Sequence, residues 1–296
     1  MQILRSIATG PHRVAFVLTS RPGPEVRGAT VSHLARTLGL ETLPARRVRR
    51  PELARRFLAE RVDLLLNVHS LHVIHEENVR APRIGAFNLH PGPLPRYAGL
   101  NAPSHALRCG ETSHGVTLHW MDAGIDTGAI AWQTGFEIGE GETGLSLSIR
   151  CIREGVALLK GLLEAASRDP SSIPRVEQSP AERTYFGRAV PEDGRLAWDR
   201  PARSLYDFVR AADFHPLPSP WGTLRARLDG AEIGVMRAGP PRELTDAEPG
   251  TIVTAGDGVV LVACRDAWLP LLLVRLDGTV RDAADVLTGS VRLSDG

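Results

Sequence analysis

Lysine, cysteine and long apolar runs are scarce in this sequence. We interpret the scarcity of lysine as a bias of composition, whereas the other two scarcities each argue against a class of protein. Lys160 is the only lysine among 35 basic residues. Cys109, Cys151 and Cys264 lack the short spacings of metal-binding or redox motifs, so we expect reduced thiols in a cytoplasmic protein. We expect no membrane span, which needs about 20 apolar residues, and no signal peptide. The formal net charge of +1 gives no overall attraction to nucleic acid or membrane.

Short apolar runs alternate with helical patterns in the first part of the chain. Strands are expected at 13–19, 62–68 and 84–87, and helices at 29–40, 51–60 and 143–167. This alternation predicts an α/β domain over residues 1–168 with a doubly wound, mostly parallel sheet. In such sheets a binding site lies outside the carboxyl ends of the strands. Asn88 and His90 follow the strand that ends at residue 87.

The composition changes near Asp169. Residues 169–190 begin with a run of proline and serine and are predicted to be a linker. Residues 191–296 contain a helical pattern at 203–212, followed by short apolar strands that glycine and aspartate turns separate. This pattern predicts a small C-terminal β-barrel domain.

The segment 87–128 carries the densest set of chemical groups. Asn88 and His90 are two residues apart at a strand end, so their side chains leave the same face. An amide donor beside an imidazole can polarise a carbonyl and handle a proton. Asp126 lies in a later glycine-rich turn and is available to orient His90, although Asp122 competes for that role.

Two motifs in this segment carry a family resemblance. The sequence reads NLHPGPLP at 88–95 and MDAGIDTG at 121–128. Together they resemble the folate-dependent formyltransferases, which include methionyl-tRNA formyltransferase, sugar N-formyltransferases and the formylation domains of nonribosomal peptide synthetases. The resemblance covers most of residues 13–296. The family usually opens with a strand and a loop, whereas residues 1–8 are predicted here to be the end of a helix.

The resemblance implies a fold, a donor and catalytic residues. The implied fold is a Rossmann-like formyltransferase sheet followed by an OB-like barrel, and the implied formyl donor is 10-formyltetrahydrofolate, with no metal. Asn88, His90 and Asp126 map onto the family's catalytic residues. In the implied reaction an amine attacks the formyl carbon, Asn88 donates to the oxyanion, and either His90 or Asp126 takes the amine proton.

The resemblance also implies a folate slot between the loop 67–74 and the turn 122–126. The residues assigned to donor binding are Ser70, Leu71, His72, Phe87, Asp122 and Gly124. Tyr97 and Asn101 are assigned to the acceptor pocket. Two alternatives stay open: Asn101 is only the N-cap of the next helix, and the loop 67–74 only packs.

Two further clusters have alternative interpretations. His69, His72 and His75 are spaced by three and would share a helical face, as a metal site requires, but no carboxylate motif accompanies them. The strongest charge run comprises Arg46, Arg47, Arg49, Arg50, Arg55 and Arg56. It is either a solvated face or a dock for folate polyglutamate or an acidic carrier protein.

Charge discriminates between the possible acceptors. Residues 181–296 contain 14 arginines, no lysine and 17 acidic residues, a net charge of −3. A domain that grips tRNA phosphates is expected to be basic. We therefore favour a small or carrier-tethered amine in specialised metabolism over initiator methionyl-tRNA. A catalytically silent folate-binding module is the alternative of another class, and a homodimer is possible in each case.

Overall fold

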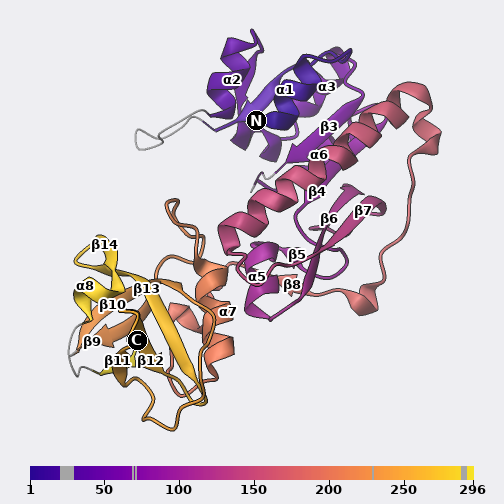
Figure 1. Ribbon diagram of the computed structural model, residues 1–296. Helices are drawn as coiled ribbons and strands as arrows, with labels where there is room; N and C mark the ends of the chain where they lie inside the picture. Colours follow the sequence, from indigo (N-terminus) through magenta and orange to yellow (C-terminus); the bar gives the residue numbers. More distant parts are fainter. Residues whose placement is uncertain (21–29, 69, 71, 229, 288–291) are drawn as a thin grey trace. The chain divides into compact units, whose positions relative to one another are not determined.

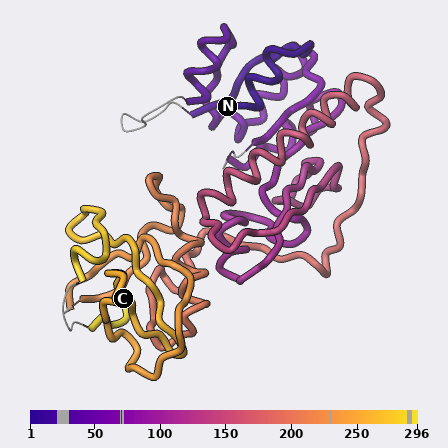
Figure 2. Tube along the Cα trace, in the orientation of Figure 1, coloured from indigo at the N-terminus to yellow at the C-terminus, as the bar shows by residue number. Residues whose placement is uncertain are grey.

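The computed structural model describes residues 1–20, 30–68, 70, 72–228, 230–287 and 292–296. These residues form two compact units that interleave along the chain, as the trace in Figure 2 allows the reader to follow. The first unit comprises Met1–Ala98, Gly115–Gly135 and Cys151–Thr184, and the second comprises Gly99–His114, Phe136–Arg150 and Tyr185–Gly296. The domain boundaries expected from the sequence, 1–168, 169–190 and 191–296, stay a prediction.

A four-stranded sheet in the order β3-β4-β6-β7 organises the first unit (Figure 1). Its strands are β3 (Leu64–Val68), β4 (Gly85–His90), β6 (Ser113–Trp120) and β7 (Ile130–Glu137). β3 and β4 are parallel, whereas β6 is antiparallel to β4. A separate two-stranded sheet pairs β1 (Val17–Thr19) with β2 (Thr42–Pro44) in parallel. The predicted α/β class is therefore confirmed.

The first unit also contains helices, of which all but η1 lie where the sequence predicts helical structure. They are α1 (Gln2–Ala8), α2 (Val31–Thr37), η1 (Ala45–Arg49), α3 (Leu53–Ala59), α4 (Glu76–Arg80) and α6 (Gly144–Arg168). Thr30 is the N-cap of α2, and its side chain accepts a 3.1 Å hydrogen bond from the His33 N–H. α6 packs closely on β4 at Gly155, where an added Cβ would lie 2.6 Å from Leu89. A larger residue at position 155 would force the side chain of Leu89 to move.

The second unit contains a closed antiparallel sheet. Its order is β11-β12-β13-β10-β9-β15, with β14 paired to β13. The strands are β9 (Leu224–Leu228), β10 (Ala231–Ala238), β11 (Ile252–Thr254), β12 (Val260–Ala263), β13 (Trp268–Leu276), β14 (Thr279–Asp282) and β15 (Leu293–Asp295). A bridge between Thr251 and Arg292 joins the two ends of this order, and the Leu293 N–H donates to the Gly250 carbonyl at 2.9 Å. The predicted C-terminal barrel is thus confirmed.

The remaining elements of the chain are β5 (Ala98–Gly99), α5 (Ala102–Arg108), η2 (Pro170–Ser172), η3 (Pro180–Glu182), β8 (Tyr185–Phe186), η4 (Pro191–Gly194), α7 (Ala202–Ala212) and α8 (Ala283–Val286).

A buried ion pair fixes the helical part of the second unit. On α7, Arg210 pairs with Asp207 at 2.7 Å and donates to the carbonyls of Glu140 and Glu142. This contact holds the loop before α6 against α7. Among the described helices, none has the length and apolarity to cross a membrane.

A buried histidine should make this unit sensitive to acid. His105 is 6% exposed, and its ring stacks on Phe186 with the centroids 4.0 Å apart. Burial lowers the pKa of His105 to about 4. Because the unfolded chain has the higher pKa, about 6.5, it binds the proton first, and stability is lost as the pH falls from 6.5 towards 4. His105→Phe keeps the stacking, so we expect its urea midpoint to fall less over this range than that of the wild type. Equal falls in both proteins would contradict the assignment.

Candidate active site

Three polar residues form a row across the first sheet. In the strand register, Asn88 on β4 pairs with Asn67 on β3 and with His119 on β6. Paired residues in neighbouring strands point to the same face. Asn67 Nδ2 donates to Asn88 Oδ1 at 2.8 Å. This bond fixes the Asn88 amide so that its own N–H groups are directed away from Asn67.

Asp126 completes the predicted set of three. Its Oδ1 accepts a 3.1 Å hydrogen bond from Asn88 Nδ2, and its Oδ2 lies 3.4 Å from His90 Nδ1. The carboxylate of Asp122 is used differently, because it accepts from the Gly124 N–H at 3.0 Å and from the Thr127 hydroxyl at 2.6 Å. Asp122 therefore shapes the turn, and Asp126 is the carboxylate that reaches Asn88 and His90.

The segment predicted to be a linker holds Asp126 in place. Asp126 has a positive φ of 54°, a conformation that needs support. Gln178 Nε2 donates to the carbonyls of Asp126 at 3.0 Å and of Gly128 at 2.7 Å. Arg183 donates to the carbonyls of Asp126 at 3.3 Å and of Ile125 at 2.8 Å. Sequence reasoning missed both side chains, because a Pro- and Ser-rich segment gives no signal of where it packs.

The surroundings of His90 define its tautomer. Nε2 lies 2.7 Å from the Tyr97 carbonyl, an acceptor only, so Nε2 carries the proton. Burial lowers the pKa of His90, and the charge of Asp126 and the bond to Tyr97 oppose this shift in part. The neutral ring therefore presents the Nδ1 lone pair to Asp126. Two proton acceptors, His90 Nδ1 and Asp126 Oδ2, face one another across 3.4 Å.

His119 is a second imidazole in the site, and sequence reasoning missed it. Its Nδ1 lies 2.7 Å from the Trp120 carbonyl, so that nitrogen carries the proton. Its Nε2 lone pair lies 3.1 Å from Asn88 Nδ2 and 3.4 Å from Asp126 Oδ1. The alternation of residues 114–121 places His119 opposite the apolar side chains, but only the strand register shows that it faces Asn88.

Two predicted contact residues prove to be buried. Phe87 is fully buried, with its ring centroid 4.2 Å from that of Trp120. The side chain of Phe87 therefore packs in the core, and the assignment of this residue to donor binding stays a prediction. The side chain of Tyr97 is also buried, and its φ is 59°. The Tyr97 carbonyl accepts a hydrogen bond from His90 Nε2, and the assignment of Tyr97 to the acceptor pocket stays a prediction.

The other predicted contacts divide into three groups. Ser70, His72, Asp122 and Gly124 lie at least partly exposed on the first unit, whereas Leu71 falls outside the described residues. Asn101 stands at the N-cap position of α5 with a φ of 54°, but its side chain makes no capping bond. It belongs to the second unit, so its predicted contact with an acceptor stays a prediction.

The histidine spacing does not make a helical face. α4 begins only at Glu76, and His75 caps it by accepting from the Glu77 N–H at 3.3 Å. His72 precedes the helix, and His69 is not among the described residues. The described part of the chain contains no group of three or more metal-ligating side chains. The alternative of a metal site depended on one helical face shared by the histidines, and the described histidines, His72 and His75, form no such face.

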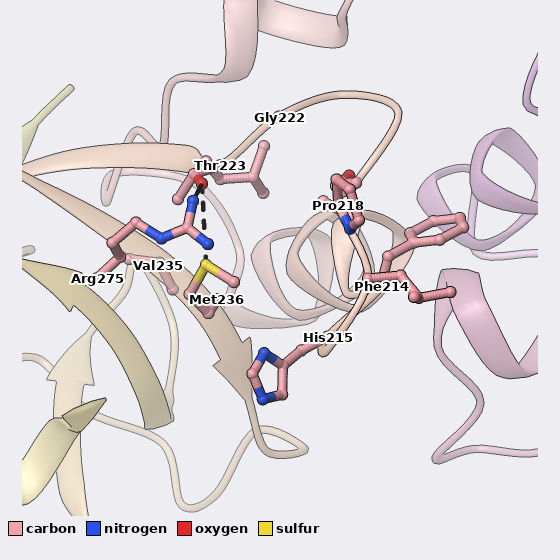
Figure 3. A pocket seen from close by; sticks show the side chains of 12 residues that line it. Phe214, His215, Pro218, Gly222, Thr223, Val235, Met236 and Arg275 are labelled. Atoms are coloured by element: carbon pink, nitrogen blue, oxygen red, sulfur yellow. Dashed lines mark hydrogen bonds between the residues drawn. The ribbon is translucent and has the colours of Figure 1, made fainter. Parts of the chain in front are cut away.

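The second unit contains a small pocket (Figure 3). Its volume is about 120 Å³, below the roughly 300–1,000 Å³ of typical small-molecule sites. Phe214, Pro218 and Met236 line it, and Arg275 donates to the Thr223 hydroxyl at 2.7 Å at its side. We assign this pocket no part in the chemistry of Asn88, His90 and Asp126.

Comparisons with known sequences cover nearly the whole chain. Residues 2–162 match the family described as "Formyl transferase", and residues 188–290 match "Formyl transferase, C-terminal domain". The methionyl-tRNA formyltransferase of Thiobacillus denitrificans is 29% identical over 299 residues, covering 99% of this chain and 94% of that protein. That of Symbiobacterium thermophilum is 30% identical over 276 residues, covering 88% and 82%.

Solved structures of sugar-modifying enzymes share the fold. An N-formyltransferase from Helicobacter canadensis, in complex with folinic acid and dTDP-3-aminofucose, has a TM-score of 0.62 at 17% identity, covering 85% of this chain and 86% of that one. The sugar 3N-formyl transferase WlaRD, in the presence of dTDP and 5-N-formyl-THF, has a TM-score of 0.67 at 16% identity, covering 91% and 92%. At these identities the likeness shows the fold alone.

Proposed function

The chain belongs to the formyl transferase family, and from this premise we propose that it transfers a formyl group from 10-formyltetrahydrofolate to the amine of a small or carrier-tethered acceptor. The observation that carries the proposal is the convergence of Asn88, His90 and Asp126. The Asp126 carboxylate lies within 3.1 Å of the Asn88 amide and 3.4 Å of the His90 ring. An amide, an imidazole and a carboxylate in contact are the groups that acyl transfer to an amine needs.

The loop after β3 offers a polar group for the donor. His72 Nδ1 is buried and has no hydrogen-bond partner among the described residues. A buried ring nitrogen without a partner is costly unless a ligand satisfies it, and the polar edge of a pterin fits this need. We propose that Ser70 and His72 contact the donor, together with Asp122 and Gly124 of the turn. The bound donor would supply the electrophilic formyl carbon.

Each residue of the site has a proposed role. The two N–H groups of Asn88 Nδ2 point here to Asp126 Oδ1 and His119 Nε2. One of them would turn to the formyl oxygen as negative charge develops there, and such a donor is worth about 3–4 kcal/mol of the barrier. His90 and Asp126 would hold the proton that leaves the acceptor nitrogen, between Nδ1 and Oδ2. That proton would pass to the donor nitrogen as its bond to the formyl carbon breaks and tetrahydrofolate leaves. Asn67 and His119 would orient Asn88, because they contact its amide oxygen and nitrogen, respectively.

The same site admits initiator methionyl-tRNA as a second candidate acceptor. The similarity to methionyl-tRNA formyltransferases along 99% of the chain favours it, whereas the net charge of −3 over residues 181–296 favours a small or tethered amine. A third outcome is donor binding without transfer, as a catalytically silent module would show.

An acceptor screen separates these candidates. The purified chain is incubated with 10-formyltetrahydrofolate and, in turn, amino sugars, ornithine derivatives, aminoacylated carrier proteins and methionyl-tRNA, and tetrahydrofolate release is followed. We expect turnover with one of the small or tethered amines, at a rate that changes less than about twofold between 50 and 200 mM salt. Turnover with tRNA alone, falling steeply over that salt range because phosphate contacts release counterions, would overturn the choice of acceptor.

A further inference from the structure

Five exposed arginines lie on a short stretch of the first unit. The proposed chemistry of Asn88, His90 and Asp126 makes no use of their positive charge. η1 is a 3-10 helix, in which residues three apart share a face. Ala45 and Val48 have that spacing and are buried in the core. The outward side chains of this stretch and of the start of α3 are exposed. We define the arginine surface as Arg46, Arg47, Arg49, Arg50 and Arg55.

The arginine surface makes no side-chain hydrogen bond or ion pair with a described residue. Arg56, next in the chain, shows the contrast, because its guanidinium lies 2.7 Å from Glu41 and 3.2 Å from Glu60. Glu52 is the only acidic residue between Arg46 and Arg56. Crowded like charges repel one another, and a bound polyanion relieves that repulsion.

Buried hydrogen bonds tie the arginine surface to the proposed donor loop. The Val48 carbonyl accepts from the His75 N–H and from Asn78 Nδ2, both at 2.8 Å. Asn78 is fully buried and also donates to the Arg50 carbonyl at 2.9 Å. His72 is three residues from His75, a reach of at most about 11 Å for an extended chain. The backbone at His72 is therefore within about 11 Å of His75, and His75 is hydrogen-bonded to Val48, which lies between Arg47 and Arg49 in the chain.

We propose that the arginine surface binds the polyglutamate chain of the folate donor, an inference that rests on the proposed function. Each added glutamate brings one carboxylate, and the arginine guanidinium matches a carboxylate in a two-pronged hydrogen bond. The chain is flexible and extends away from the pterin end of the donor. If the donor binds at the loop after β3, the carboxylates of its glutamates could contact the guanidinium groups of the arginine surface.

The size of the arginine surface favours this ligand over a macromolecule. A specific protein interface buries about 1,200–2,000 Å² in total, whereas this surface is the outer face of one short 3-10 helix and the start of α3. A tRNA would need basic charge over a larger area, and residues 181–296 carry a net charge of −3. A short polyanion needs only neighbouring cations.

The test compares folates with one and with five glutamates. Dissociation constants of 5-formyltetrahydrofolate in both forms are measured by calorimetry at 50 mM salt for the wild type and for Arg46→Gln/Arg47→Gln/Arg49→Gln/Arg50→Gln. The control variant, Arg188→Gln/Arg195→Gln/Arg227→Gln/Arg281→Gln, removes the same charge from four exposed positions of the second unit. Turnover with monoglutamyl 10-formyltetrahydrofolate reports on the catalytic residues.

We expect the wild type and the control variant to bind the pentaglutamate about tenfold more tightly than the monoglutamate. Several weak surface ion pairs together give a difference in binding free energy of that size. The first variant should bind both forms alike and keep its turnover with the monoglutamate. The proposal would be overturned if the wild type bound both forms equally or if the first variant kept the preference for the pentaglutamate. It would also be overturned if the only change in the first variant were a higher KM for the acceptor. Failure of the wild type to bind either folate would instead overturn the proposed function.

Discussion

Replacing Asn88 with alanine is expected to lower kcat for formyl transfer by about 100- to 1,000-fold, the usual cost of removing one donor to a developing oxyanion. KM for the donor should change little, because the interaction strengthens only as charge appears on the formyl oxygen. The measurement is steady-state release of tetrahydrofolate with a saturating acceptor. The side chain that is lost contacts Asn67, His119 and Asp126, so the melting temperature of the variant is recorded as well.

Asn67→Ala is the matched control for this prediction. It removes the 2.8 Å bond to Asn88 Oδ1 and leaves the donating nitrogen of Asn88 in the site. We expect a smaller loss than for Asn88→Ala, because the amide becomes free to turn but is not removed. Equal turnover of Asn88→Ala and wild type, with both proteins folded, would contradict the role assigned to Asn88.

Replacing Asp126 with asparagine is expected to lower kcat by about 100- to 10,000-fold, the range of a lost general acid or base. The change also alters the pH profile. Burial lowers the pKa of His90 and Asp126 opposes that shift, so removing the carboxylate lowers the pKa of His90 further. Residual activity that depends on neutral His90 should therefore persist to lower pH than in the wild type. The measurement is kcat/KM between pH 4.5 and 8.

Asp122→Asn tests whether the position of the carboxylate matters. Asp122 lies in the same turn, but its bonds go to Gly124 and Thr127 and not to His90. We expect kcat to fall by less than about tenfold, since the turn is weakened and the acceptors of the proton are untouched. A loss as large as that of Asp126→Asn, in a protein that still binds folate, would show that the two carboxylates had been assigned the wrong way round.

The sequence singled out Asn88, His90 and Asp126, which the structure brings into contact, because these residues carry local signals. Asn88 and His90 are two residues apart on one strand, so their common face follows from the geometry of a strand. Asp126 lies in a turn whose motif carries the family resemblance. His119 has no such signal, because its contact with Asn88 depends on the register between β4 and β6. Register is set by long-range packing, and sequence periodicity leaves it open.

Two features of the fold were beyond sequence reasoning for related reasons. Residues 169–184 contain turn-forming residues, which predict a linker, yet Gln178 and Arg183 bind the backbone of the Asp126 turn. A segment that lacks periodicity does not reveal what it packs against. The elements themselves were predictable, since apolar spacing distinguishes a helix such as α6 from a strand such as β3, but the interleaving of the two units follows only from the contacts.

One measurement tests the central claim most directly. The wild type, Asn88→Ala and Asp126→Asn are each given formyl-labelled 10-formyltetrahydrofolate and the acceptor found in the screen, in a single turnover with enzyme in excess. The account predicts that the wild type moves the label to the amine and releases an equal amount of tetrahydrofolate, while both variants bind the donor with the label still attached. Label transfer at the wild-type rate in either variant would contradict the account.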